Sequence, residues 1–247
     1  MKTPNAALLY ACRVRDVHDD LDFIKTFCRN SSVLEIGCGT GRIPEALLDV
    51  GITKYVGIDT DPQRLEVCQQ RFGSCAKFRL ARANFLDVNK KTYGIFDRIL
   101  LCFNVLSEFS GTENRRRALA ITASLLAPGG RVLIALPAPD DALFDRTTTT
   151  IRKRFVCNGE LWIAEFDIAR QASTKTSEVT VRYSQESGLD TSIVTDHYRN
   201  EQITREELFS HYAASKLELE KEYGSFSGSS YDSHSQNIIH VLKAKSS

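Results

Sequence analysis

A short apolar run that leads directly into three regularly spaced glycines constrains the fold of this chain more than any other feature. Residues 32–42 read SVLEIGCGTGR, with glycine at positions 37, 39 and 41. The apolar run predicts a buried strand. Because glycine has no Cβ, the following loop can turn tightly and let a ligand approach its backbone. A strand that ends in such a loop and opens a helix is typical of the nucleotide-binding end of a doubly wound α/β fold.

Two residues beside the glycines narrow the kind of ligand. The dinucleotide fingerprint G-x-G-x-x-G would need glycine at position 42, where this chain has Arg42. Glu35 precedes the first glycine by two residues. Its carboxylate would repel a pyrophosphate, but it suits a ligand that carries an amino group and a sulfonium. The motif therefore argues against a nicotinamide-dependent dehydrogenase.

The first half of the chain alternates between strand and helix patterns. Residues 8–30 have the apolar spacing of a helix or a helix pair. We expect strands at 33–36, 55–59, 78–81, 96–102 and 131–136. Helices are expected near 42–50, from Pro62 after the N-cap Asp61, and over 113–126. This alternation predicts βαβ units and a mostly parallel sheet.

The pattern changes after residue 136. β-rich runs at 155–158, 161–170, 178–183 and 192–198 follow one another without helices, which predicts a small antiparallel sheet. We expect the threonine run 147–150 to be a loop. A helix over 204–212, with Thr204 and Glu207 as a capping box, precedes two more strands near 217–223 and 237–243.

Together these elements predict an α/β fold with a doubly wound, mostly parallel, seven-stranded Rossmann-like sheet and an antiparallel β insert after the fifth strand. The predicted core is residues 1–137, including an N-terminal helical segment. The insert is residues 138–200, and residues 201–247 return to the core with a helix and the last two strands.

The composition excludes several classes of protein. With 26% charged residues and a net charge of +1, the chain lacks the basic bias of most nucleic-acid-binding proteins. No apolar run approaches the ~20 residues that a membrane helix requires. The seven cysteines are scattered without C-x-x-C spacing, so we expect reduced thiols, a cytoplasmic location and no metal site.

Glu35, the three glycines and an acidic residue at the end of the second strand resemble motif I and its surroundings in class I S-adenosylmethionine (SAM) dependent methyltransferases. That acidic residue is Asp59, 24 residues after Glu35. The resemblance is strongest over residues 31–136. It implies that the glycine loop passes beneath the methionine part of SAM, that Glu35 complements its ammonium group, and that S-adenosylhomocysteine is the product. A carboxylate at Asp59 can accept hydrogen bonds from the two ribose hydroxyls.

The same resemblance extends the candidate cofactor site. Asn84 and Phe85 stand where the family commonly presents an acidic residue and an apolar one to adenine. Residues 102–104 lie at the carboxyl end of the fourth strand and would face the transferred methyl group. Tyr10 and Arg13 could fold over the ligand's carboxylate. The complete candidate set is Glu35, Gly37, Cys38, Gly39, Gly41, Asp59, Thr60, Asn84, Phe85, Cys102, Phe103, Asn104, Tyr10 and Arg13.

The sequence constrains the identity of the methyl acceptor less than that of the methyl donor. The Asn/Asp-Pro-Pro-Tyr/Phe motif of amino-directed DNA methyltransferases is missing after the fourth strand, and Cys102 has no preceding proline. Residues 223–228 and the insert are similar to small-molecule methyltransferases of the sugar and amine N-methyltransferase kind, in which such an insert covers the acceptor pocket. Candidate catalytic residues are Glu108, His197 and Tyr231.

We therefore expect methyl transfer to nitrogen or oxygen of a small molecule, by a monomer or a homodimer. A protein- or RNA-directed methyltransferase is the main alternative, and its support is the arginine triplet 115–117 and the basic run 152–154. A non-catalytic protein with the same fold is the third possibility.

Overall fold

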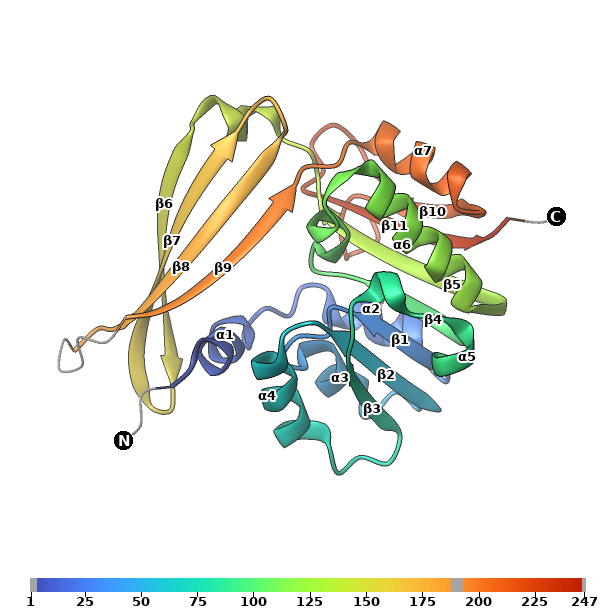
Figure 1. The fold of residues 1–247 in the computed structure, drawn as a ribbon, viewed down its shortest axis with the longest axis horizontal. Helices are drawn as coiled ribbons and strands as arrows, with labels where there is room; N and C mark the ends of the chain where they lie inside the picture. The colour runs from blue at the N-terminus through green and yellow to red at the C-terminus, as the bar shows by residue number, and fades with distance from the viewer. Residues whose placement is uncertain (1–3, 188–192, 246–247) are drawn as a thin grey trace. The chain divides into compact units, whose positions relative to one another are not determined.

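The computed structural model describes residues 4–187 and 193–245 and contains an α/β core and a separate antiparallel sheet (Figure 1). The chain divides into two compact units. Residues 18–139 and 203–247 form one unit, here called the core. Residues 1–17 and 140–202 form the other, here called the insert unit.

A seven-stranded sheet with the order β10-β11-β5-β4-β1-β2-β3 forms the middle of the core. The first five strands pair in parallel, whereas β11 runs antiparallel to both β5 and β10. This arrangement confirms the predicted mostly parallel, seven-stranded sheet. The strands are β1 (Ser32–Ile36), β2 (Lys54–Asp59), β3 (Phe78–Arg82), β4 (Phe96–Leu101), β5 (Leu126–Pro137), β10 (Leu217–Tyr223) and β11 (Asn237–Ala244).

Apolar side chains on both faces of this sheet build two buried clusters. Leu34 and Ile99 belong to one cluster, whereas their neighbours Val33 and Leu100 belong to the other, because successive strand residues point to opposite faces. A sheet that is buried on both faces is what a doubly wound fold requires. The core helices are α2 (Leu21–Cys28), α3 (Arg42–Leu47), α4 (Pro62–Phe72), α5 (Lys90–Tyr93), α6 (Gly111–Leu125) and α7 (Arg205–Ala214).

Local signals in the sequence fix where two of these helices begin. The Asp61 side chain accepts hydrogen bonds from two backbone N–H groups in the first turn of α4, and Pro62 opens the helix. Thr204 and Glu207 form the predicted capping box at the start of α7. Both helix starts were predicted from the sequence.

Four antiparallel strands form the sheet of the insert unit, in the order β6-β7-β8-β9. They are β6 (Thr148–Cys157), β7 (Glu160–Gln171), β8 (Thr176–Gln185) and β9 (Val194–Glu201). Helix α1 (Ala6–Val14) packs on one face of this sheet, where its residue Leu9 is buried in a cluster with Trp162 and Phe166. We call that side the inner face and the opposite side the outer face.

Three sequence-based assignments differ from the structure. Residues 1–17 were assigned to the core, but α1 packs on the insert sheet, because the apolar spacing of a helix does not show which surface it will cover. Residues 148–150 of the threonine run belong to β6 and are not a loop, consistent with the strand preference of β-branched residues. Strand β5 begins at Leu126, before the Pro-Gly-Gly segment. Ser192, where the last insert strand was predicted to begin, lies outside the described residues.

The expectation that every cysteine is reduced is wrong for two of them. Cys12 on α1 and Cys157 at the end of β6 form a disulfide across 145 residues of sequence, with their Cα atoms 5.4 Å apart. Scattered spacing gave no sign of this pair, because the fold and not the local sequence brings them together. Cys28, Cys38, Cys68, Cys75 and Cys102 are free thiols.

Reduction of this disulfide is expected to destabilise the insert unit by about 2–4 kcal/mol, because the cross-link restricts the unfolded chain. Thermal unfolding with and without a reducing agent measures the change. The Cys12→Ser variant in oxidising buffer should unfold like the reduced protein. If wild-type protein unfolded at the same temperature with and without the reducing agent, the disulfide between Cys12 and Cys157 would be contradicted.

Candidate functional site

The glycine loop leaves the carboxyl end of β1 in an unusual backbone conformation. Gly37, Gly39 and Gly41 have φ angles of +72°, +53° and +87°, a region that other residues adopt only at a cost. At two of these glycines there is also no room for a side chain. A Cβ on Gly37 would lie 2.5 Å from a methyl carbon of Val105, and one on Gly41 would lie 2.6 Å from the ring of Phe72.

Asp59, at the end of β2, fixes the shape of this loop. Its Oδ2 accepts a hydrogen bond from the backbone N–H of Gly39 at 2.8 Å, and its Oδ1 accepts one from the N–H of Asp61 at 2.9 Å. A Cβ added to Gly39 would meet no atom within 4 Å, so the loop is unobstructed in that direction. The structure therefore brings Asp59 to the central glycine, and the carboxylate retains lone pairs for a ligand's hydroxyls.

Glu35 is held inside the core below the same loop. Its side chain is 5% exposed, and the hydroxyl of the fully buried Tyr55 donates to its Oε2 at 2.5 Å. Burial raises the pKa of Glu35 to about 8, against the lowering effects of the Tyr55 hydrogen bond and the Arg42 charge. A protonated carboxyl that a nearby cation can ionise is suited to receive a ligand's ammonium group.

The Glu35→Gln variant is expected to gain stability relative to wild type as the pH rises. Below pH 4.5 the carboxyl is protonated in both the folded and the unfolded protein. Between pH 4.5 and about 8 only the unfolded chain ionises, so wild type loses stability that the variant, whose amide cannot ionise, retains. Each pKa unit corresponds to about 1.4 kcal/mol. Urea unfolding at pH 5 and pH 8.5 measures the free energy of unfolding of both proteins. If the difference between the two proteins were the same at both pH values, the raised pKa of Glu35 would be contradicted.

Arg42 connects three segments at this edge of the sheet. Its guanidinium forms a two-pronged ion pair with Asp20 at 2.6 and 2.7 Å, and both side chains are largely buried. The same guanidinium lies 4.8 Å from the ring centroid of Phe103. The sequence showed only that position 42 is not glycine. The ion pair was missed because Asp20 stands 22 residues earlier and has no local signature.

The loop after β4 has backbone strain of its own. Phe103 and Asn104 both adopt left-handed φ angles, +57° and +70°, although neither is glycine. Such conformations persist where the surrounding structure determines them, and they cluster at functional sites. Phe103 is 45% exposed, whereas Cys102 beside it is buried, and burial raises the pKa of its thiol well above the ordinary value. Cys102 therefore has the character of an inert core thiol.

Two candidate adenine contacts are placed less favourably. The Asn84 side chain accepts from the backbone N–H of Leu86 and caps the short 3-10 helix η1 (Phe85–Asp87). Phe85 is 3% exposed and packs in the core cluster, edge to face with Phe109. The Asn84 oxygen thus has one local partner, and the Phe85 ring is enclosed in the core. Thr60, by contrast, is exposed after Asp59.

The candidate catalytic residues are distributed over both units. Glu108 is exposed at the end of the 3-10 helix η2 (Val105–Glu108), which follows β4. Tyr231 lies in the loop between β10 and β11, partly buried, with the Arg205 guanidinium 5.7 Å from its ring centroid. His197 is on the outer face of the insert sheet, where its Nδ1 lies 3.1 Å from the Thr180 hydroxyl. Tyr10 and Arg13 belong to the insert unit.

A polar network behind Tyr231 was not predicted from the sequence. Buried His240 contacts the Tyr212 hydroxyl through Nδ1 at 2.8 Å and Glu222 through Nε2 at 2.9 Å. Glu222 in turn accepts two hydrogen bonds from Arg205. Burial lowers the pKa of His240, so its ring is a neutral connector. Through Arg205 this network supports the β10–β11 loop, which joins the sheet at the carboxyl end of β5.

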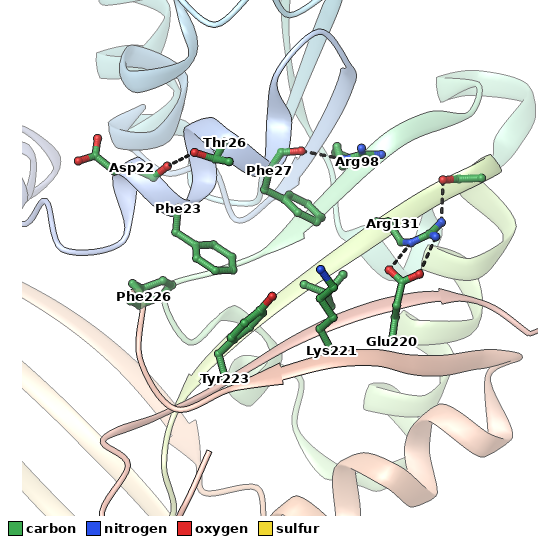
Figure 2. Close-up of a pocket in the computed structure, with 12 residues that line it drawn as sticks. Asp22, Phe23, Thr26, Phe27, Arg98, Arg131, Glu220, Lys221, Tyr223 and Phe226 are labelled. Carbon is green, nitrogen blue, oxygen red and sulfur yellow. Dashed lines mark hydrogen bonds and ion pairs between the residues drawn. The ribbon is translucent and has the colours of Figure 1, made fainter. Parts of the chain in front are cut away.

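The cavity shown in Figure 2 is separate from these residues. It has a volume of about 670 Å³ and lies between α2 and the β10–β11 side of the core. Phe23, Tyr223 and Phe226 line it, and Arg131 and Glu220 form an ion pair at its other end. None of the predicted site residues lines it. Among the described residues, no cluster of three or more potential metal ligands occurs, and no helix has the length and apolarity needed to cross a membrane.

Comparison with protein families and curated sequences identifies related domains. Residues 34–132 match the model of a methyltransferase domain. The O-methyltransferase cnsE of Penicillium expansum is 26% identical over 60% of this chain and 53% of its own length. The tRNA (carboxymethyluridine(34)-5-O)-methyltransferase ALKBH8 of Mus musculus is 27% identical over 57% of this chain and 20% of its own. The chain thus matches about half of one relative and a fifth of the other.

Solved structures share the fold over nearly the whole chain. A SAM-dependent methyltransferase from Clostridium acetobutylicum has a TM-score of 0.79 at 16% identity, over 97% of this chain and 98% of its own. The sugar N-methyltransferase KedS8 from a Streptoalloteichus species has a TM-score of 0.73 at 16% identity, over 100% of this chain and 95% of its own. These likenesses confirm the predicted Rossmann-like fold class.

Proposed function

We propose that this chain, which carries a methyltransferase domain at residues 34–132, transfers the methyl group of SAM to an oxygen or nitrogen atom of a small molecule. The observation that carries the proposal is the geometry of the glycine loop. Asp59 accepts a hydrogen bond from the backbone N–H of its central glycine, and Glu35 is buried beneath it. This combination matches a ligand that has hydroxyls, an ammonium group and no pyrophosphate. The match to the methyltransferase domain covers the same residues.

The residues present fit SAM chemically. Asp59 would accept hydrogen bonds from the ribose hydroxyls while it holds Gly39. Glu35 would become the counterion of the ammonium group. The unobstructed side of Gly39 leaves room for the ligand along the backbone, where a side chain would intrude. Phe103 and Asn104 would face the methionine end from the loop after β4.

When bound, SAM supplies an electrophilic methyl group on a sulfonium. The protein's contribution is then to orient the two reactants and exclude water, which can be worth up to ~7–11 kcal/mol. The Arg42–Asp20 ion pair holds the start of α3 and supports the Phe103 ring. An acceptor hydroxyl would also need a proton acceptor, for which Glu108 and Tyr231 are the candidates on the core.

The macromolecular alternative is less well supported. A ribosomal protein L11 methyltransferase and the tRNA methyltransferase above are among the relatives, and the basic runs 115–117 and 152–154 could contact phosphates. However, Arg115 is buried, and Arg152 and Arg154 are paired with Glu165 and Glu186. These three of the six residues in the two runs are therefore buried or ion-paired, which weakens the support for a surface that binds nucleic acid.

Two measurements test the proposal. Calorimetry should detect binding of SAM and of S-adenosylhomocysteine, and isotope-labelled SAM should label a component of a small-metabolite extract. Label found only in RNA or protein fractions would favour the macromolecular alternative. Binding without any transfer would indicate a non-catalytic protein, and failure to bind either ligand would reject the proposal altogether.

A further inference from the structure

Arg13, on the inner face of the insert sheet, is a cation without an anionic partner in the part of the chain that the structure describes. Its guanidinium carbon lies 5.1 Å from the ring centroid of Tyr10 and 5.0 Å from that of Phe166. Its Nε is buried and has no hydrogen-bond partner among the described residues. No described carboxylate forms an ion pair with it, whereas Arg15 nearby is paired with Asp16. Because Arg13 is partly exposed, a ligand can reach it.

Other groups on the same face also offer hydrogen-bond donors. The Nε1 of Trp162 is buried without a partner among residues 4–187 and 193–245, four residues along β7 from Phe166. The partly buried Tyr198 hydroxyl is close enough to Arg13 that the guanidinium lowers its pKa, against the larger raising effect of burial. Asp196 lies on this face as well, two strands from Phe166. It is not ion-paired with Arg13 in the described part of the chain.

We infer that the inner face of the insert sheet binds the anionic group, carboxylate or phosphate, of a small acid. The guanidinium of Arg13 supplies the charge and a planar set of donors that matches carboxylate and phosphate geometry. Tyr10 and Phe166 limit where the guanidinium can move, so little freedom is lost on binding. This anion site does not depend on the proposed function.

This assignment revises the expectation for Arg13 from the sequence. There, Arg13 was a candidate for the carboxylate of SAM. In the structure its packing partners Tyr10 and Phe166 both belong to the insert unit. The two assignments predict different consequences when the charge is removed.

The probes for the test are benzoate, phenyl phosphate and the neutral benzamide. Calorimetry on the full chain should detect binding of one or both anions and none of benzamide. Trp162 is the only tryptophan of the chain, so a change in its fluorescence on titration would locate binding in the insert unit. Comparison of benzoate with phenyl phosphate separates a carboxylate site from a phosphate site.

The variant Arg13→Gln should weaken anion binding at least tenfold, whereas Arg13→Lys should retain most of it. The matched control is Arg15→Gln, which removes an exposed arginine of the same segment and should not change binding. Equal binding of benzamide, or unchanged anion binding by Arg13→Gln, would overturn the inference. So would a loss of SAM affinity in Arg13→Gln while anion binding persists. If wild type fails to bind SAM, the proposed function fails, but the anion measurements still decide the site.

Discussion

Replacing Asp59 with alanine is expected to weaken SAM binding at least a hundredfold. The variant loses the carboxylate that accepts from the N–H groups of Gly39 and Asp61, and with it the proposed ribose contacts. Hydrogen bonds to a charged group contribute about 1.5–3 kcal/mol each. A tenfold change in affinity corresponds to about 1.4 kcal/mol, so two such bonds account for the expected loss. Calorimetric titration with SAM measures it.

Asp61→Ala provides the matched control for this measurement. It removes a carboxylate two residues away that caps α4 through Gln63 and Arg64. Loss of a cap costs about 1 kcal/mol of stability, but we expect SAM affinity to change little. If the two variants bound SAM equally well, Asp59 would have no specific role in the site.

Replacing Gly41 with alanine is expected to destabilise the core by about 2–5 kcal/mol. The new Cβ would lie 2.6 Å from the Phe72 ring and 2.8 Å from the Cys68 sulfur, both of which are buried. Overpacking of this kind typically costs about 1–3 kcal/mol. The left-handed φ of +87° adds about 1–2 kcal/mol for any residue with a Cβ. Urea unfolding of the variant and of wild type gives the difference.

Gly39→Ala separates the effect on folding from the effect on the ligand. Its Cβ would meet no protein atom within 4 Å, so only the backbone cost of about 1–2 kcal/mol should appear in the unfolding free energy. Its SAM affinity should fall sharply, because the methyl group would extend into the space assigned to the ligand. A Gly39→Ala protein that bound SAM like wild type would show that the ligand does not pass this glycine.

Much of the core fold could be predicted, because its signals are local. Apolar runs, glycine turns and capping residues such as Asp61 and Thr204 each act within a few residues of their own position. The partner of α1 could not be predicted, because an amphipathic helix has an apolar face that fits many surfaces. The disulfide between Cys12 and Cys157 was missed for the same reason: it depends on that packing.

In the candidate site, too, residues with a local signal were predicted, and contacts that depend on strand pairing were not. Glu35 and Asp59 were identified because each stands at a fixed distance from a strand end, and the structure places them below and beside the glycine loop. The partner of Glu35, Tyr55, was seen only as a strand residue, because the register between β1 and β2 determines the contact. Asn84, a candidate adenine contact from the resemblance, also caps the 3-10 helix η1 in the structure, a role that the sequence analysis did not predict.

The insert unit is built from two segments of the sequence, residues 1–17 and 140–202, and the first segment of the core lies between them. This order has a consequence for synthesis of the chain. Helix α1 is made before the insert sheet, and its disulfide partner Cys157 follows Cys12 by 145 residues. At about 5–20 residues per second, roughly 7–29 s pass between the synthesis of Cys12 and that of Cys157. During this time the apolar side of α1, including Leu9, has no native surface to cover. Strands β1 to β5 of the core are made within that interval, whereas α7, β10 and β11 follow the insert, so the newly made chain passes through a state in which α1 is a natural target for chaperones.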